Sequence, residues 1–155
     1  MIDLNKMPKL GFGLMRLPEK DGAVDIERVK TMVDKYIKSG MNYFDTAYVY
    51  QGSEAATKSA LCDRYPRDSY YLASKLNAAE FACKSEAEAK NEIRVSLERT
   101  GAGYFDFYLL HALIDGKSVL TLDDAKNFLD DVDAEMLWFF AAKTNLPSNV
   151  FHFDK

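Results

Sequence analysis

Four side chains that can hold or transfer protons are spaced along the first three quarters of the chain. Asp45, Lys75 and His111 each come at the end of a short apolar run, and Tyr50 lies five residues after Asp45. If the apolar runs are parallel strands, their C-terminal ends meet at one edge of a sheet. We therefore expect the four side chains to be neighbours in space.

A phenol beside an ammonium, a carboxylate and an imidazole can act as a proton-transfer device. A phenol ordinarily ionises near pH ~10, so at neutral pH it is a weak acid. The ammonium of Lys75 favours the phenolate of Tyr50, and Asp45 holds that ammonium and keeps it charged in a partly dry site. His111 can orient a carbonyl oxygen or relay a proton, depending on its tautomer. This set suits protonation of an oxygen that becomes alkoxide-like when a hydride reaches its carbon.

Short apolar runs alternate with longer segments of helical periodicity, which is the pattern of βα units around a parallel sheet. Each step from one run to the next is about 30 residues, the length of one βαβ unit. Residues 1–114 therefore hold four such units. The predicted strands are 10–14, 41–44, 70–73 and 104–110, and the predicted helices are about 25–39, 53–64 and 85–100.

The predicted helices carry start and stop signals. Asp25 is placed to cap the first helix, and Gly40 stands where the residue after a helix belongs. Ser85 and Glu88 have the spacing of a capping box for the third helix, and Gly101 ends it. These signals support helices between the predicted strands.

The segment Gly40–Glu54, followed by Ala-Ser-Lys75 and Leu-Leu-His111, resembles the aldo-keto reductase family. The resemblance covers roughly residues 8–114 and keeps the order and spacing of the motifs. It implies the fold of the family, a barrel of eight βα units. It also implies a catalytic tetrad of Asp45, Tyr50, Lys75 and His111, with Tyr50 as the proton donor and NADPH as the hydride source.

The resemblance extends to residues that would lie near the cofactor. Gly13, Leu14 and Met15 correspond to the first-strand residues near the nicotinamide, and Asp45 joins them. Gly52 and Glu54 belong to the same motif, and we assign them a turn role and a surface role. The choice of NADPH over NADH rests wholly on the resemblance.

Each member of the tetrad also has a purely structural interpretation. Asp45 could cap the next helix or form a buried ion pair with Lys75 that has no catalytic duty. Tyr50 could be simple packing, and His111 could be a satisfied polar residue at a strand end. Structural networks also hold titratable groups, so each of these alternatives is favoured when a residue is taken singly. Four such residues at strand ends in family order favour a chemical site.

Composition excludes several other classes of protein. Hydrophobic residues make up 48% of the chain and charged residues 28%, which is typical of a folded domain. The net charge of −4 leaves no basic surface for nucleic acid. No stretch approaches the ~18 apolar residues of a membrane span, and no leader peptide is recognisable. Cys62 and Cys83 form neither a disulfide framework nor a metal-ligand cluster. We expect a single-domain cytoplasmic protein without a metal.

The length predicts an incomplete barrel. A full barrel of this type needs about 250 residues, whereas this chain has 155. The βα alternation is lost after Leu113, and apolar spacing predicts one helix over 121–132 and a second over 133–141. We therefore expect an α/β fold with the first four βα units of a TIM (β/α)8-type barrel, followed by one or two C-terminal helices in the divergent segment 115–155.

Two functions follow from this truncated form. The first is NADPH-dependent reduction of an aldehyde or ketone, weak or absent in this chain alone because the family's later strands hold much of the cofactor. The second is a non-catalytic half-barrel that serves assembly or regulation. An open half-barrel would leave strand edges unpaired at the first and fourth strands, so we also expect self-association through these edges. The identity of the small carbonyl substrate is not predicted.

Overall fold

The computed structural model describes residues 7–77, 84–111, 137–142 and 149–152. Its main feature is a six-stranded sheet in the order β1-β4-β5-β6-β7-β8. These strands are Phe12–Gly13, Tyr43–Asp45, Tyr71–Asn77, Phe105–His111, Leu137–Ala142 and Asn149–His152. Between them lie a short β2-β3 hairpin (Glu19–Lys20, Ala23–Val24) and the helices α1 (Ile26–Lys38), α2 (Ser53–Thr57) and α3 (Glu86–Thr100). A π-helical turn, Lys58–Cys62, continues α2, and a 3-10 turn, Arg67–Ser69, precedes β5.

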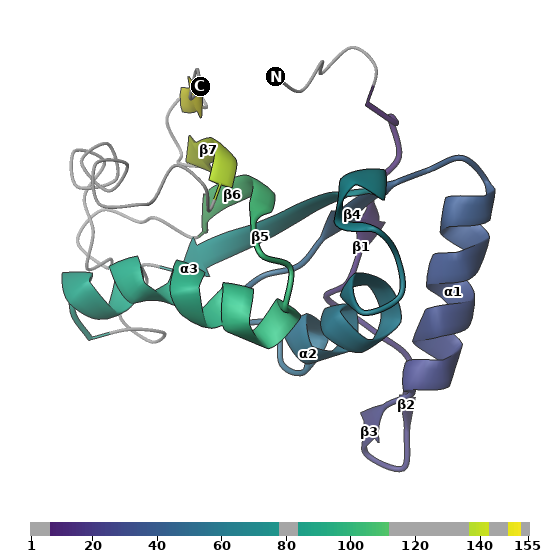
Figure 1. Ribbon diagram of the computed structural model, residues 1–155. Coiled ribbons are helices and arrows are strands. Elements are labelled where there is room, and N and C mark those ends of the chain that lie inside the picture. The colour runs from purple at the N-terminus through teal and green to yellow at the C-terminus, as the bar shows by residue number, and fades with distance from the viewer. Residues whose placement is uncertain (1–6, 78–83, 112–136, 143–148, 153–155) are drawn as a thin grey trace.

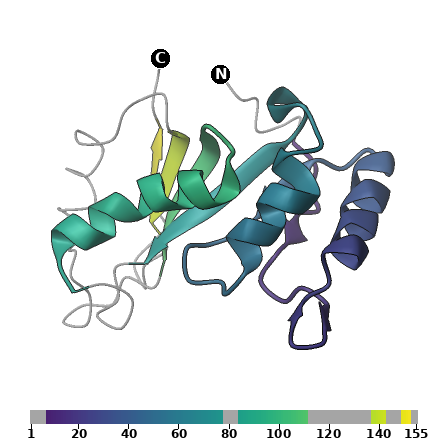
Figure 2. The same cartoon turned by 60° about the horizontal axis from the view of Figure 1, so that its bottom comes forward.

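The predicted parallel arrangement is confirmed. Strands β1, β4, β5, β6 and β7 run parallel to one another, and β8 pairs antiparallel with β7. Helices α1, α2 and α3 lie on the same side of the sheet (Figures 1 and 2). This is the arrangement of a partial βα barrel, in which helices cover the outer face of a curved parallel sheet.

The core lies between the helices and one face of the sheet. Phe44 of β4 and Leu72 of β5 are fully buried against Val29 and Val33 of α1 and other apolar residues of the cluster. Because side chains alternate along a strand, the neighbours of these buried residues point to the opposite face. That opposite face corresponds to the inside of the barrel.

The predicted helix ends are observed. The side chain of Asp25 accepts a hydrogen bond from Arg28 N at 3.1 Å and caps α1. Ser85 Oγ accepts one from Glu88 N at 3.2 Å and caps α3. Gly101 follows α3 in the left-handed conformation, with φ of +63°, which ends the helix without a steric penalty.

The C-terminal segment differs from the prediction. The second predicted helix, over 133–141, is wrong, because Leu137–Ala142 is strand β7. The sequence Leu-Trp-Phe-Phe-Ala-Ala is continuously apolar and aromatic, so helical spacing could be traced through a segment that suits a covered strand equally well. The first predicted helix, over 121–132, lies outside the described residues.

The fourth strand of the barrel is therefore not an edge. Strand β7 pairs with β6 in parallel, with Phe105 opposite Leu137 and Leu110 opposite Ala142. The expected open edge at this strand is wrong, and β8 extends the sheet one strand further. The sheet continues past the point where the sequence pattern predicted that it would stop.

A buried ion pair fastens β5 to β6 at the end of the sheet away from the predicted site. Arg67 Nη2 lies 2.6 Å from Asp106 Oδ2, and the guanidinium stacks 3.7 Å from the ring centroid of Tyr104. Asp106 Oδ2 also accepts a hydrogen bond from Leu72 N at 2.7 Å. Its side chain is only 6% exposed, and burial raises the pKa of Asp106. The carboxylate thus depends on Arg67 for its compensating charge.

We predict that Arg67→Ala lowers the free energy of unfolding by about 3–5 kcal/mol, because it leaves the buried carboxylate of Asp106 without a compensating positive charge. The matched control is Arg64→Ala, which breaks a more exposed pair with Asp34 and should cost about 0–1 kcal/mol. Urea denaturation of both variants measures the difference. Equal losses in the two variants would contradict the role assigned to Arg67.

Candidate active site

The predicted ion pair between Asp45 and Lys75 is present at the C-terminal edge of the sheet. Lys75 Nζ lies 2.5 Å from Asp45 Oδ1 and donates a second hydrogen bond to the main-chain oxygen of Thr46 at 2.6 Å. The side chain of Lys75 is 11% exposed and that of Asp45 is 30% exposed. The ammonium is therefore mostly withdrawn from water and compensated by two oxygens.

Tyr50 and His111 join this pair. Lys75 Nζ lies 4.8 Å from the centroid of the Tyr50 ring, a cation–π distance. The rings of Tyr50 and His111 are 5.9 Å apart between centroids and meet edge to face at 89°. The structure thus brings together Asp45, Lys75 and His111, which the sequence placed at strand ends, and Tyr50, which follows the first of them. Their chemical roles stay predictions.

Strand register explains why residues so far apart in sequence converge. Asp45 pairs across the sheet with Ala73, two residues before Lys75. His111 pairs with Asn77, two residues after Lys75. The three side chains share the barrel-side face, and each lies further along its strand than the one before. This stagger is the tilt that a sheet needs in order to curve into a barrel.

The loop 46–52 carries Tyr50 from the end of β4 to the start of α2. It is a series of tight turns: Tyr50 N donates to Ala47 O at 3.0 Å, and Ser53 N donates to Tyr50 O at 3.0 Å. Gly52 has φ of +73°, so the turn role predicted for it is confirmed. A residue with a Cβ would be strained at this position, which makes the path of the loop depend on glycine.

The predicted cofactor residues Gly13, Leu14 and Met15 lie at the end of β1 and just after it, next to Asp45 of β4. Gly13 pairs with Asp45, and the space where a Cβ of Gly13 would stand holds no other atom within 4 Å. Leu14 has no exposed surface, and its main-chain oxygen accepts a hydrogen bond from Ser53 Oγ at 2.8 Å. Met15 is 56% exposed. Gly13 and Met15 thus lie where a ligand could reach them, whereas Leu14 belongs to the core.

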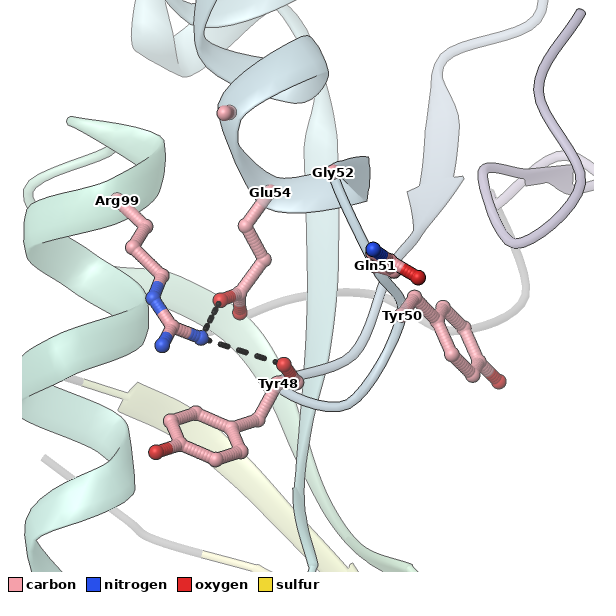
Figure 3. Close-up of a pocket in the computed structure, with 7 residues that line it drawn as sticks. Tyr48, Tyr50, Gln51, Gly52, Glu54 and Arg99 are labelled. Carbon is pink, nitrogen blue, oxygen red and sulfur yellow. Dashed lines mark hydrogen bonds and ion pairs between the residues drawn. The ribbon is translucent and has the colours of Figure 1, made fainter. Parts of the chain in front are cut away.

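Sequence reasoning missed Glu54. The surface role assigned to it is wrong, because the residue is 3% exposed. Glu54 Oε1 accepts a hydrogen bond from Ser74 Oγ at 3.0 Å, and Glu54 Oε2 lies 3.3 Å from Arg99 Nη1. The only signal in the sequence was its place in the motif, two residues after Gly52. Figure 3 shows Glu54 and Arg99 facing each other behind the loop.

A pocket of about 390 Å³ lies on this outer side of the loop. It is lined by Tyr48, Tyr50, Gln51, Gly52, Glu54, Ala55 and Arg99. In Figure 3 the side chain of Tyr50 points away from the Glu54–Arg99 pair. Tyr50 thus lines this pocket, and its ring also lies beside Lys75.

A second buried carboxylate lies near the end of β5. Glu92 of α3 is 2% exposed, and its Oε2 accepts a hydrogen bond from Asn77 N at 2.6 Å. Burial raises the pKa of Glu92 to about 8, and the nearby carboxylate of Glu54 acts in the same direction. Burial thus favours the protonated form of Glu92 in the folded protein.

This proton predicts a pH dependence of stability. The pKa of Glu92 is about 8 in the folded chain, against an ordinary value of 4.5. The folded state then binds more protons between these values, so its contribution to stability is complete below pH ~4.5 and is lost as the pH rises toward ~8. Glu92→Gln, which mimics the protonated acid, should remove this loss.

Urea denaturation at pH values between about 5 and 8 measures the effect. The control is Glu98→Gln on the exposed side of α3. If the free energy of unfolding changes with pH equally in wild type and Glu92→Gln, the prediction is contradicted. Glu98→Gln should show the same pH dependence as wild type.

No group of three or more His, Cys, Asp or Glu side chains that could hold a metal ion occurs among the described residues. In the same part of the chain, no helix is long and apolar enough to span a bilayer.

The fold and the site together define part of a βα-barrel protein, with a tyrosine, lysine, aspartate and histidine at the C-terminal edge of its strands. The family model of the aldo/keto reductase family matches residues 9–134. The chain therefore belongs to the aldo-keto reductase family. The match runs beyond Ile114, so the family pattern does not end where the sequence analysis placed its loss.

Curated relatives agree with this assignment. An aldo-keto reductase of Mycobacterium sp. (strain MCS) is 30% identical over 109 residues, which is 70% of this chain and 35% of the relative. An aldo-keto reductase of Mycobacterium ulcerans (strain Agy99) is 32% identical over 110 residues, again 70% of this chain and 35% of the relative. The chain thus spans about a third of the length of the curated relatives that it matches.

Solved structures match a larger part of the chain. An aldo-keto reductase of Bacillus halodurans in its holo form is 28% identical, with a TM-score of 0.67 over 86% of this chain and 45% of that one. An aldo-keto reductase of Bombyx mori in complex with NADP is 21% identical, with a TM-score of 0.64 over 88% of this chain and 46% of that one. These matches confirm the fold as part of an aldo-keto reductase barrel.

Proposed function

We propose that this chain carries the proton-transfer site of an NADPH-dependent reductase of aldehydes or ketones, with Tyr50 as the acid. The observation that carries the proposal is the position of Lys75 between Asp45 and the ring of Tyr50, at 2.5 Å and 4.8 Å respectively. A structural ion pair needs no phenol beside it. A tyrosine that must give up a proton gains from a fixed cation at this distance.

The bound cofactor would supply a hydride to the carbonyl carbon. As the carbon gains the hydride, the carbonyl oxygen takes the proton of the Tyr50 hydroxyl and an alcohol results. Lys75 stabilises the phenolate left on Tyr50, and Asp45 keeps the ammonium in place until the phenolate is protonated again from water. His111, edge to face with Tyr50, orients the carbonyl oxygen.

The residues at the edge of β1 fit the nicotinamide end of such a cofactor. The open space at Gly13 lies beside Asp45, so a flat ring can approach the main chain there. Gly13, Met15 and Asp45 are the residues that would hold it. Aldo-keto reductases of Bombyx mori and Klebsiella pneumoniae were solved with NADP and NADPH. Because this chain spans about a third of its curated relatives, we expect weak binding by the chain alone.

We predict that Tyr50→Phe lowers kcat/KM for a generic aldehyde by about 100-fold or more, because the acid is lost while the packing of the ring is kept. The measurement is the consumption of NADPH by absorbance, with cofactor binding followed by fluorescence. The control is Tyr65→Phe. The hydroxyl of Tyr65 donates to Asp34 and is remote from the site. Full activity of Tyr50→Phe would refute the role of Tyr50.

The alternative proposal is a non-catalytic half-barrel that assembles with a second copy or another chain. The observation that favours it is the barrel-side face, where the rings of Tyr43 and Tyr71 pack at an angle against Phe107, with centroids 5.6 and 6.4 Å away, and all three residues are only partly buried. In a closed barrel, side chains on this face pack against those of the other strands.

Size-exclusion chromatography with light scattering, alongside NADPH titration, separates the two proposals. A stable dimer that binds no NADPH and has no turnover would support the assembly module. A monomer that binds NADPH and reduces an aldehyde would support the enzyme and rule out the module.

A further inference from the structure

We propose that Arg99 is a positioning residue that holds the loop 46–52, and with it Tyr50, against the Asp45–Lys75 pair. The inference rests on the proposed function, because it concerns the placement of the proposed proton donor. Arg99 lies in the last turn of α3 and reaches across to the loop. It does not touch the predicted reacting groups, since Tyr50 points to the other side of the loop (Figure 3).

The guanidinium of Arg99 makes three contacts with Tyr48 and Glu54. Arg99 Nη1 donates to the main-chain oxygen of Tyr48 at 3.3 Å and lies 3.3 Å from Glu54 Oε2. The guanidinium also stacks over the ring of Tyr48, 4.5 Å from its centroid. Tyr48 is two residues before Tyr50, so these contacts fix the main chain immediately ahead of the proposed acid.

Glu54 gives the arginine a rigid support. Its other oxygen accepts a hydrogen bond from Ser74 Oγ at 3.0 Å, and Ser74 is fully buried on β5. Ser74 is the neighbour of Lys75 in sequence, and the two side chains point to opposite faces of the strand. Arg99 is therefore connected, through Glu54 and Ser74, to the same strand that carries Lys75.

The loop is also held from the barrel side by Lys75. Tyr48 N donates to the main-chain oxygen of Lys75 at 3.3 Å, and Lys75 Nζ donates to Thr46 O at 2.6 Å. The loop is thus hydrogen-bonded to Lys75 of β5 on one side and to Arg99 of α3 on the other. Removing the outer contacts frees the main chain at Tyr48 to swing, and Tyr50 moves with it.

Arginine suits this position better than lysine. Its planar guanidinium can stack on a ring and donate to two acceptors in the same plane, whereas an ammonium is a single point charge. Arg99→Lys should keep the charge beside the buried Glu54 but lose the stacking. The side chain of Arg99 is 45% exposed, so neither Arg99→Lys nor Arg99→Met opens a cavity in the core.

The test compares wild type, Arg99→Lys and Arg99→Met with the control Arg94→Met, which changes an exposed arginine of the same helix. The first readout needs no activity: hydrogen exchange of the peptide that spans 46–52, relative to the peptide that spans 71–77 of β5. We expect faster exchange of the loop in both Arg99 variants, more in Arg99→Met, and unchanged exchange of β5 in Arg99→Lys, which keeps a positive charge beside the buried Glu54.

The second readout is kinetic. A misplaced acid should lower kcat by about 10- to 100-fold in Arg99→Met, with KM for NADPH unchanged, because displacements near 1 Å have effects of this size. Arg99→Lys should recover part of the loss, and Arg94→Met should behave as wild type.

The outcomes separate this inference from the proposed function. Unchanged loop exchange in Arg99→Met would overturn the positioning role whatever the activity does. Faster exchange throughout the chain in Arg99→Lys, or a fall in kcat that Arg94→Met shares, would overturn it as well. If wild type has no turnover, the proposed enzyme is lost, while selective loosening of the loop would still support Arg99 as the residue that places Tyr50.

Discussion

A positive charge held in a mostly dry place is the constraint on which the arrangement of the site depends. The ammonium of Lys75 is withdrawn from water, and an ion in that position is costly unless oxygens surround it. Asp45 and the main-chain oxygen of Thr46 supply them. Because those oxygens come from the end of β4 and from the loop that follows it, the charge fixes the position of that strand end and the start of its loop. Tyr50 lies beside the lysine because it belongs to this same loop.

The two faces of β5 have different roles: one packs in the core and the other carries Lys75. On the helix side, Leu72 and Leu76 belong to the buried apolar cluster, and Ser74 supports Glu54. On the barrel side, Lys75 faces the predicted chemistry. Packing on one face therefore sets the rigidity of the other, since a strand cannot shift its barrel-side face without disturbing the core behind it.

Sequence reasoning found the residues whose placement depends on topology alone. Asp45, Lys75 and His111 could be placed together because parallel strands bring their ends to one edge. Glu54 could not, because its burial requires Arg99, 45 residues further along the chain. Strand β7 was missed for another reason: a continuous apolar run carries no periodicity that distinguishes a strand from a helix. Local patterns predict which elements form, but they do not reveal a contact that only tertiary packing creates.

The two outermost strands of the described sheet are short, with two residues in β1 and four in β8. Long, flat edges let one molecule template the next into an extended stack, and brief ones offer few main-chain groups for such growth. Strand β8 also runs antiparallel to its neighbour β7, so the described sheet is mixed at this border. The short borders of the described sheet thus disfavour extended edge-to-edge association of the protein.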